Sequence, residues 1–160
     1  MEGKIYSINV KPFALGEKGL PKKAIEMAFI GVRGVGGDFN YYRNEKKNGD
    51  LRRAISLYPY EMLEQLRVEG FPIEPGHLGE NITTRGVPYD FFVVGEKYRF
   101  GDEVVVEISE PILPCRNLKL LPYFHEVNVK KLLKDRRGWY ARVIKEGDIQ
   151  MKDFIERVEG

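Results

Sequence analysis

Short stretches in which hydrophobic and polar positions alternate recur along most of this chain. In residues 4–10, Tyr6, Ile8 and Val10 fall on one face, with the period of two that is expected of a half-buried strand. The same kind of pattern predicts strands over residues 22–30, 53–57, 81–84, 91–94, 97–100, 103–109, 140–145 and 150–155. Glycine-containing turns separate several of them. Many short strands of this kind predict a β-barrel or a strongly curved sheet.

Helical patterning is confined to two places. Residues 59–69 form the clearer helix, because Pro59 suits a first helical position and Gly70 suits the end of a helix. Its predicted buried stripe consists of Met62, Leu63 and Leu66. A second, short helix is predicted over residues 128–135, with Asn128 as its N-cap. The fold class is therefore mainly β with a few short helices.

Length and charge narrow the class of protein. The 160 residues are enough for one hydrophobic core, and we expect a single domain over residues 1–160. Twenty-six Lys and Arg against 24 Asp and Glu leave a net charge of +2, too small to indicate a nucleic-acid partner. No apolar run is long enough for a membrane span, and the first residues do not resemble a signal peptide. The sequence predicts a cytoplasmic protein that contacts neither nucleic acid nor membrane.

Cys115 is the first candidate for chemistry. It is the only cysteine, so no disulfide can form within the chain, and it lies in a loop between Pro114 and Arg116. A neighbouring cation favours the thiolate, which is the nucleophile, the sulfur carrier and the ligand of soft metals. The alternative is a small buried hydrophobic residue, which is the commoner fate of a lone cysteine.

Two glycine-rich segments are further candidates. Residues 76–84 place Glu80, Asn81 and Thr83 at the start of a strand, where they can offer donors and acceptors to a polar ligand or cap their own turn. Residues 31–38 end in Asp38, which can orient a ligand or simply stabilise a turn. This second segment lacks the spacing of a phosphate-binding loop, so we do not expect it to bind a nucleotide.

Arginines are candidate partners for an anionic group, because the guanidinium fork is planar and bidentate. Arg52, Arg53 and Arg116 lie close in sequence to the candidate loops. Arg142 interrupts an apolar stretch, where an inward-facing charge requires a counter-charge or a ligand. By contrast, two histidines and one cysteine without metal-ligand spacing argue against structural zinc, and no serine-hydrolase motif is present.

Read together, several motifs resemble the MOSC domain, the family named for the C-terminal domain of molybdenum cofactor sulfurases. They occur in the family's order and span nearly the whole chain. The motifs are Gly19-Leu-Pro21-Lys22, Gly36-Gly37-Asp38, Arg53-Ala-Ile-Ser56-Leu-Tyr58, Pro75-Gly76-His-Leu-Gly79-Glu80-Asn81-Ile-Thr83, Gly101-Asp102, Pro111-x-x-Pro114-Cys115 and Gly138-Trp-Tyr140-Ala141-Arg142-Val143. The chain looks like a stand-alone prokaryotic member. One departure is Asn40, near which many relatives have a histidine.

The resemblance implies a barrel-like fold and the handling of molybdenum cofactor or of sulfur. It implies that Cys115 either ligates molybdenum or carries a persulfide. It also implies that Asn81, Thr83, Arg142 and Asp38 lie near the cofactor, with Arg52 and Arg53 as further partners of its phosphate. Three alternatives remain open: a sulfur carrier that needs a persulfide donor, a molybdenum-dependent reductase of N-hydroxylated compounds that needs a separate electron-transfer protein, and a non-catalytic module that stores or delivers the cofactor. All three lead us to expect Cys115 at the same cavity as Asn81 or Thr83, with Arg142 on its wall.

Overall fold

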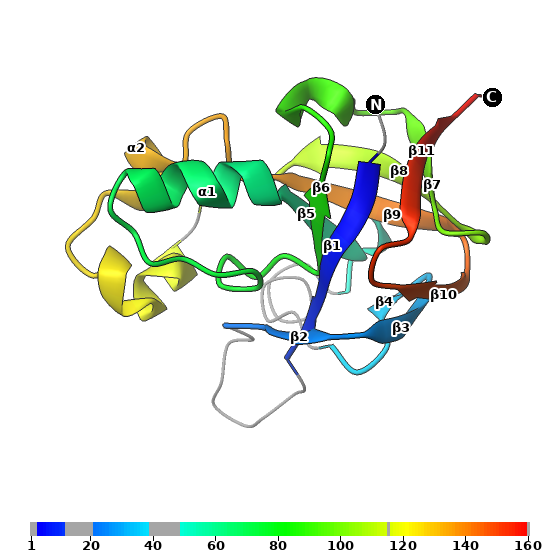
Figure 1. The fold of residues 1–160 in the computed structure, drawn as a ribbon, viewed down its shortest axis with the longest axis horizontal. Coiled ribbons are helices and arrows are strands. Elements are labelled where there is room, and N and C mark those ends of the chain that lie inside the picture. Colours follow the sequence, from blue (N-terminus) through cyan, green and yellow to red (C-terminus); the bar gives the residue numbers. More distant parts are fainter. Residues whose placement is uncertain (1–2, 12–20, 39–48, 115, 160) are drawn as a thin grey trace.

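The chain folds around a closed barrel of mixed strand direction (Figure 1). The computed structural model describes residues 3–11, 21–38, 49–114 and 116–159. The strands are β1 (Gly3–Val10), β2 (Lys23–Ile25), β3 (Met27–Gly31), β4 (Gly34–Val35), β5 (Ile55–Pro59), β6 (Ile82–Arg85), β7 (Lys97–Phe100), β8 (Val104–Pro111), β9 (Trp139–Lys145), β10 (Gly147–Gln150) and β11 (Phe154–Val158). The order β11-β7-β8-β9-β5-β6-β1 closes on itself because β1 also pairs with β11. Within this ring β5 and β6 run parallel and the other pairs are antiparallel.

The barrel interior forms one hydrophobic core, with Ile5, Leu57, Ile82 and Phe100 each at most 1% exposed. The strand β2 extends the sheet beside β1, while β3, β4 and β10 form a separate three-stranded sheet. The mainly β class with a barrel fold, which the alternating pattern predicts, is confirmed.

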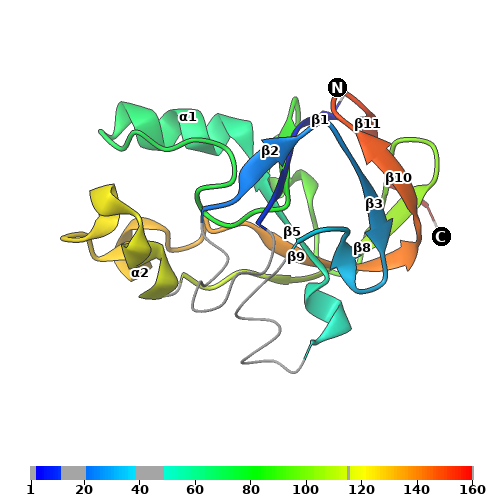
Figure 2. The ribbon, with the colours of Figure 1, turned by 90° about the horizontal axis from the view of Figure 1, so that it is seen from below.

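The two α-helices of the described chain lie together at one side of the barrel, as Figures 1 and 2 both show. The first is α1 (Tyr60–Val68) and the second is α2 (Val129–Leu132). Leu63 and Leu66 of α1 are fully buried in a second hydrophobic cluster, together with Leu118, Phe124 and Leu133. The helix ends where Gly70, at φ +104°, lets the N–H of Phe71 reach the carbonyl of Leu66. Asn128 caps α2 by accepting a hydrogen bond from the N–H of Lys131.

Three of the strand predictions are wrong in detail. The stretch 22–30 is two strands, because the chain bends at Glu26 and passes from β1 to β10 as its partner. The stretch 150–155 spans the end of β10 and the start of β11, with a turn between them. Residues 91–94 form no strand, since the hydroxyl of Tyr98 bonds the carbonyl of Phe91 and the N–H of Val93 in place of a neighbouring strand.

Short 3-10 turns connect the barrel to its loops. They are Leu51–Arg53, Tyr89–Phe91, Arg116–Leu120 and Pro122–Phe124. In the part of the chain that the structure describes, no helix has the length and apolar character needed to cross a membrane.

Candidate functional site

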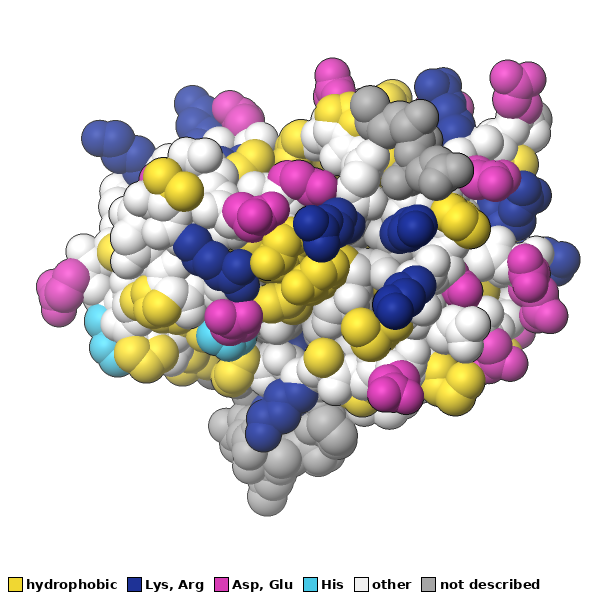
Figure 3. Space-filling view, in the orientation of Figure 1, with side chains coloured by type: hydrophobic (Ala, Val, Ile, Leu, Met, Phe, Trp, Pro, Cys, Tyr) yellow, Lys and Arg dark blue, Asp and Glu magenta, His cyan; other side chains and the backbone are white. Residues whose placement is uncertain are grey.

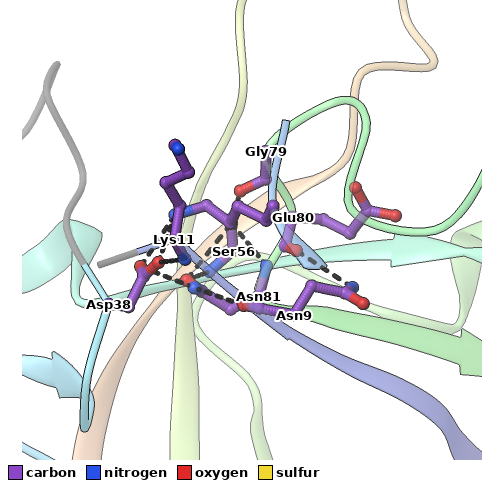
Figure 4. A network of polar contacts seen from close by, with 8 residues as sticks. Asn9, Lys11, Asp38, Ser56, Gly79, Glu80 and Asn81 are labelled. Atoms are coloured by element: carbon purple, nitrogen blue, oxygen red, sulfur yellow. Dashed lines mark hydrogen bonds and ion pairs between the residues drawn. The ribbon is translucent and has the colours of Figure 1, made fainter. Parts of the chain in front are cut away.

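A buried ion pair lies where β1 ends. The ammonium of Lys22 is 2.6 and 2.8 Å from the two carboxylate oxygens of Asp38. Both side chains are almost fully buried, at 2% and 6% exposed. The backbone N–H of Lys11 donates to the same carboxylate at 2.9 Å (Figure 4). Because burying charge is costly without good partners, this set of contacts fixes the carboxylate in one orientation.

Asn81 joins this ion pair to the sheet. Its Nδ2 donates to Asp38 Oδ2 at 2.8 Å, and its Oδ1 accepts from the N–H of Ser56 at 3.1 Å. The backbone N–H of Asn81 bonds the carbonyl of Ser56 at 3.0 Å, just before the parallel pairing of β5 with β6 begins. Figure 4 shows Asp38, Ser56 and Asn81 turned toward one another. The side chain of Asn81 therefore holds three segments of the chain in one place.

Thr83 and Glu80 continue the network into the interior. Thr83 donates to Glu80 Oε2 at 3.0 Å and accepts from Asn9 Nδ2 at 3.0 Å. Ser7 in turn donates to Asn9 Oδ1 at 2.6 Å. We call Asn9, Lys22, Asp38, Ser56, Glu80, Asn81 and Thr83 the polar cluster.

Glu80 is the unusual member of the polar cluster. Its side chain is fully buried, and its Oε1 has no hydrogen-bond partner among the described residues. Burial raises the pKa of the Glu80 carboxyl above its ordinary value, while the backbone N–H groups of Gly76 and Glu80 and the Thr83 hydroxyl oppose part of the shift. The cluster thus contains an acid whose charged form the interior disfavours.

The glycine-rich turn before Glu80 is shaped by its neighbours. Gly76 has φ +88°, and a Cβ there would lie 2.3 Å from the carbonyl oxygen of Lys22. The Gly76 carbonyl in turn accepts from the N–H of Lys22 at 2.9 Å. Only a residue without a side chain allows this close approach, so Gly76 sets the position of the Lys22 backbone beside the cluster.

Arg137 and Gly138 connect the same motif to the segment that precedes Cys115 in the sequence. The guanidinium of Arg137 donates to the carbonyl of Leu78 at 2.6 Å. The next residue, Gly138, accepts a 2.9 Å hydrogen bond from the N–H of Ile112. Two buried N–H groups here, Arg137 Nε and Trp139 Nε1, have no partner among the described residues. Cys115 itself lies outside the described residues, and only two residues separate it from Ile112.

Three of the predicted arginines, Arg52, Arg53 and Arg142, pair with carboxylates outside the polar cluster. Arg142 is on the outer side of β9, half exposed, and its Nε donates to Glu107 Oε1 at 2.5 Å. The flanking Ala141 and Val143 point inward, so strand alternation turns Arg142 outward to its counter-charge. Arg52 is 74% exposed and pairs with Asp50. Arg53 lies 2.7 Å from Glu110 and over the ring of Tyr140.

The structure thus brings together Asp38, Glu80, Asn81 and Thr83 from the predicted set. It adds Ser56, which the sequence names only within a family motif, and Asn9 and Arg137, which the sequence pattern does not single out. The sequence could have indicated Asn9, because a polar residue between Ile8 and Val10 of a buried strand needs a hydrogen-bond partner in the interior. Arg137 follows Arg136 in a basic, turn-rich stretch, and nothing in that pattern distinguishes it as a site residue. The side chain of Arg116 is not described. Among the described residues, no three His, Cys, Asp or Glu side chains gather as metal ligands do.

A closed mixed barrel with a helical side lobe and a polar cluster at the strand ends is the architecture of this molecule. The MOSC domain matches residues 44–156, which is most of the chain. The protein belongs to the MOSC domain family, a family associated with the molybdenum cofactor.

Relatives agree with this assignment. A protein named reductase from Gibberella moniliformis is 31% identical over 136 residues, covering 82% of this chain and 24% of that protein. YflK of Bacillus subtilis is 30% identical over 105 residues, covering 64% of this chain and 46% of YflK. This chain therefore spans a quarter to just under half of these relatives.

Solved structures share the fold. YuaD of Bacillus subtilis superposes with a TM-score of 0.80 at 18% identity, covering 100% of this chain and 98% of YuaD. YiiM of Geobacillus stearothermophilus superposes with a TM-score of 0.75 at 27% identity, covering 98% and 75%.

Proposed function

We propose that this protein binds molybdenum cofactor beside the polar cluster and that Cys115 is the protein ligand of molybdenum. The observation that supports the proposal is a series of hydrogen bonds that links three motif segments in turn. Asn81 bonds Asp38, and Arg137 bonds Leu78 just before Asn81. Gly138 then bonds Ile112, which precedes Cys115 by three residues.

The described residues suit such a ligand. A pterin presents hydrogen-bond donors and acceptors on one ring edge, and its phosphate is an anion. Arg137 Nε and Trp139 Nε1 are buried donors without partners, and Glu80 Oε1 is a buried acceptor without one. Unpaired buried polar atoms are rare and costly. Glu80 belongs to the glycine-rich motif and Arg137 bonds Leu78 of the same motif, so their unpaired atoms favour a polar ligand there. The cationic Arg137 also favours an anionic group.

Cys115 would supply a thiolate, which is a soft ligand suited to molybdenum. When bound, the cofactor supplies two-electron oxo-transfer chemistry. The chain's own residues would form a fixed surface for it, because Asn81 and Lys22 hold Asp38 in place and Arg137 holds the turn at Leu78. The fungal relative is named a reductase, which favours a redox role over storage alone and agrees with the reduction of N-hydroxylated compounds as the activity to assay.

Pterin analysis of the purified protein tests the proposal. Protein from a molybdenum-replete host is oxidised so that any molybdopterin becomes a fluorescent pterin, which is then quantified per chain. We expect pterin in the wild type and a roughly tenfold lower content in Arg137→Gln, which loses a charged hydrogen-bond donor. Arg142→Gln is the matched control and should keep its pterin, because Arg142 is outward-facing and pairs with Glu107.

Native mass spectrometry of the same samples separates the alternatives. A mass increment of cofactor size that disappears in Cys115→Ser supports the proposal. Wild-type protein that contains no pterin and carries one additional sulfur on Cys115 contradicts it and favours the persulfide carrier.

A further inference from the structure

A groove lies apart from the ion pair of the polar cluster, on the face seen in Figure 3, where basic and acidic side chains border a patch of hydrophobic ones. Its lining comes from β1, β2 and β6 and from the segments that contain Pro75 and Lys152. Its volume is about 840 Å³. Its wall is partly apolar, with Ile5, Ala24, Pro75 and Met151, and partly basic, with Lys4, Arg85 and Lys152. None of these three basic residues belongs to the polar cluster.

Two of the three basic residues of the groove lie opposite each other on neighbouring strands. Lys4 of β1 lies directly opposite Arg85 of β6 in the antiparallel register. Like charges at such positions are destabilising. Among the described residues, neither these two nor Lys152 forms an ion pair with a carboxylate. Glu74, the acid of the described lining, is 2.9 Å from Arg67 and so is already paired. The groove therefore concentrates positive charge that an anion would neutralise.

An aromatic wall stands beside this charge. The rings of Tyr6 and Tyr60 stack with centroids 4.0 Å apart. The guanidinium of Arg85 lies 5.7 Å from the centre of the first ring and 5.4 Å from the second. Arg67 donates to the Tyr60 hydroxyl at 3.0 Å and holds that ring in place. Preformed aromatic surface next to fixed cations is suited to a planar group that carries a negative charge.

We propose that this groove binds a phosphate monoester that carries a planar apolar group, as an aryl phosphate or a nucleoside monophosphate does. The phosphate lies between Lys4, Arg85 and Lys152, because a dianion matches several cations and an arginine fork. The planar group lies along Tyr6. The site does not depend on cofactor binding, and Cys115→Ser leaves it unchanged.

Titration with phenyl phosphate at low ionic strength, followed by NMR or calorimetry, tests the proposal. We expect phenyl phosphate to bind more tightly than inorganic phosphate, which lacks the ring, and more tightly than benzyl alcohol, which lacks the phosphate. Lys4→Gln and Arg85→Gln should each weaken it roughly tenfold, and added salt should weaken it further. Lys130→Gln is the matched control, since Lys130 is an exposed lysine of α2, and it should leave the affinity unchanged.

Thermal unfolding of the ligand-free variants shows whether they are folded, so that a loss of affinity is not mistaken for a loss of structure. Both side chains are exposed, so Lys4→Gln and Arg85→Gln should fold with a Tm close to that of the wild type. Relief of the like-charge pair and loss of the cation–π contacts with Phe154, Tyr6 and Tyr60 oppose each other. Unchanged affinity in both folded variants overturns the proposal. So does binding of inorganic phosphate as tight as that of phenyl phosphate. Binding to phosphatidylserine vesicles that phenyl phosphate does not compete away would assign the face to a membrane surface instead.

Discussion

The amide of Asn81 donates a 2.8 Å hydrogen bond to the carboxylate of Asp38, which precedes it by 43 residues. Through this bond the segment that ends at Asp38 is held against the start of β6. The same carboxylate also binds Lys22 and the N–H of Lys11. Four parts of the chain thus meet at one buried carboxylate, and the geometry of the candidate site depends on it.

Asp38→Asn should lower the free energy of unfolding by about 3 kcal/mol, because it removes the negative charge that the buried Lys22 ammonium contacts. Urea denaturation measures the change. Asp50→Asn is the matched control: its partner Arg52 is 74% exposed, so the loss there should stay below about 1 kcal/mol.

A double-mutant cycle separates the ion pair from other effects of the change. Lys22→Met combined with Asp38→Asn should cost less than the sum of the two single changes, since neither charge is left behind. Strict additivity would mean that the pair contributes no coupling and that Asp38 acts through its hydrogen bonds alone.

Gly76→Ala should destabilise the protein more than Gly95→Ala. Both glycines have nearly the same positive φ, +88° and +89°, so both changes carry the same backbone strain of about 1 kcal/mol. Only at Gly76 does the new Cβ also meet a backbone oxygen, that of Lys22, whereas nothing lies within 4 Å at Gly95. We expect Gly76→Ala to cost at least about 2 kcal/mol more in thermal or urea unfolding. Equal losses would contradict the close packing of this turn.

Glu80→Gln should change how stability depends on pH. Burial raises the folded-state pKa of Glu80 above the unfolded value near 4.5, so the folded protein binds more protons in the window above that value. In the wild type, the contribution of the Glu80 carboxyl to the free energy of unfolding is therefore largest below pH 4.5. It decreases as the pH rises toward the folded-state pKa. Glutamine has no such titration, so the free energy of unfolding should fall less between pH 5 and about 8 in the variant than in the wild type.

The exposed glutamate Glu126 provides the control for that measurement. Glu126→Gln should leave the wild-type slope unchanged between the same pH values. If Glu80→Gln also keeps the wild-type slope, the Glu80 carboxyl does not titrate in that window.

Alternation of side chains was enough to predict the barrel, because each strand buries one face against a shared core. It predicted β1 and β7 nearly residue for residue. It could not predict that residues 22–30 divide at Glu26, since both halves alternate and only the choice of partner strand differs. It failed at residues 91–94, where buried aromatic rings gave a strand-like pattern but Tyr98 took the backbone hydrogen bonds.

Part of the candidate site can also be predicted from the sequence. Asn81, Thr83 and Asp38 stand out through their glycine-rich surroundings and their match to family motifs, and the structure joins Asn81 to Asp38. For Arg142 the sequence predicts only that the charge needs a counter-charge or a ligand. The alternation along β9 then turns it outward to Glu107. Arg137 is missed, because its contact with Leu78 spans 59 residues and leaves no local pattern.

Cys115→Ser should abolish retention of the cofactor while leaving the fold intact. The sulfur is the soft ligand that serine cannot replace, whereas the volume of the side chain is nearly preserved. We expect loss of pterin fluorescence and of any reductase activity with N-hydroxylated substrates. The Tm should change by less than the shift that about 1 kcal/mol produces in a domain of this size, roughly 2–4 °C. A variant that keeps its pterin and activity but unfolds at a much lower temperature would make Cys115 a packing residue and would leave molybdenum without its protein ligand.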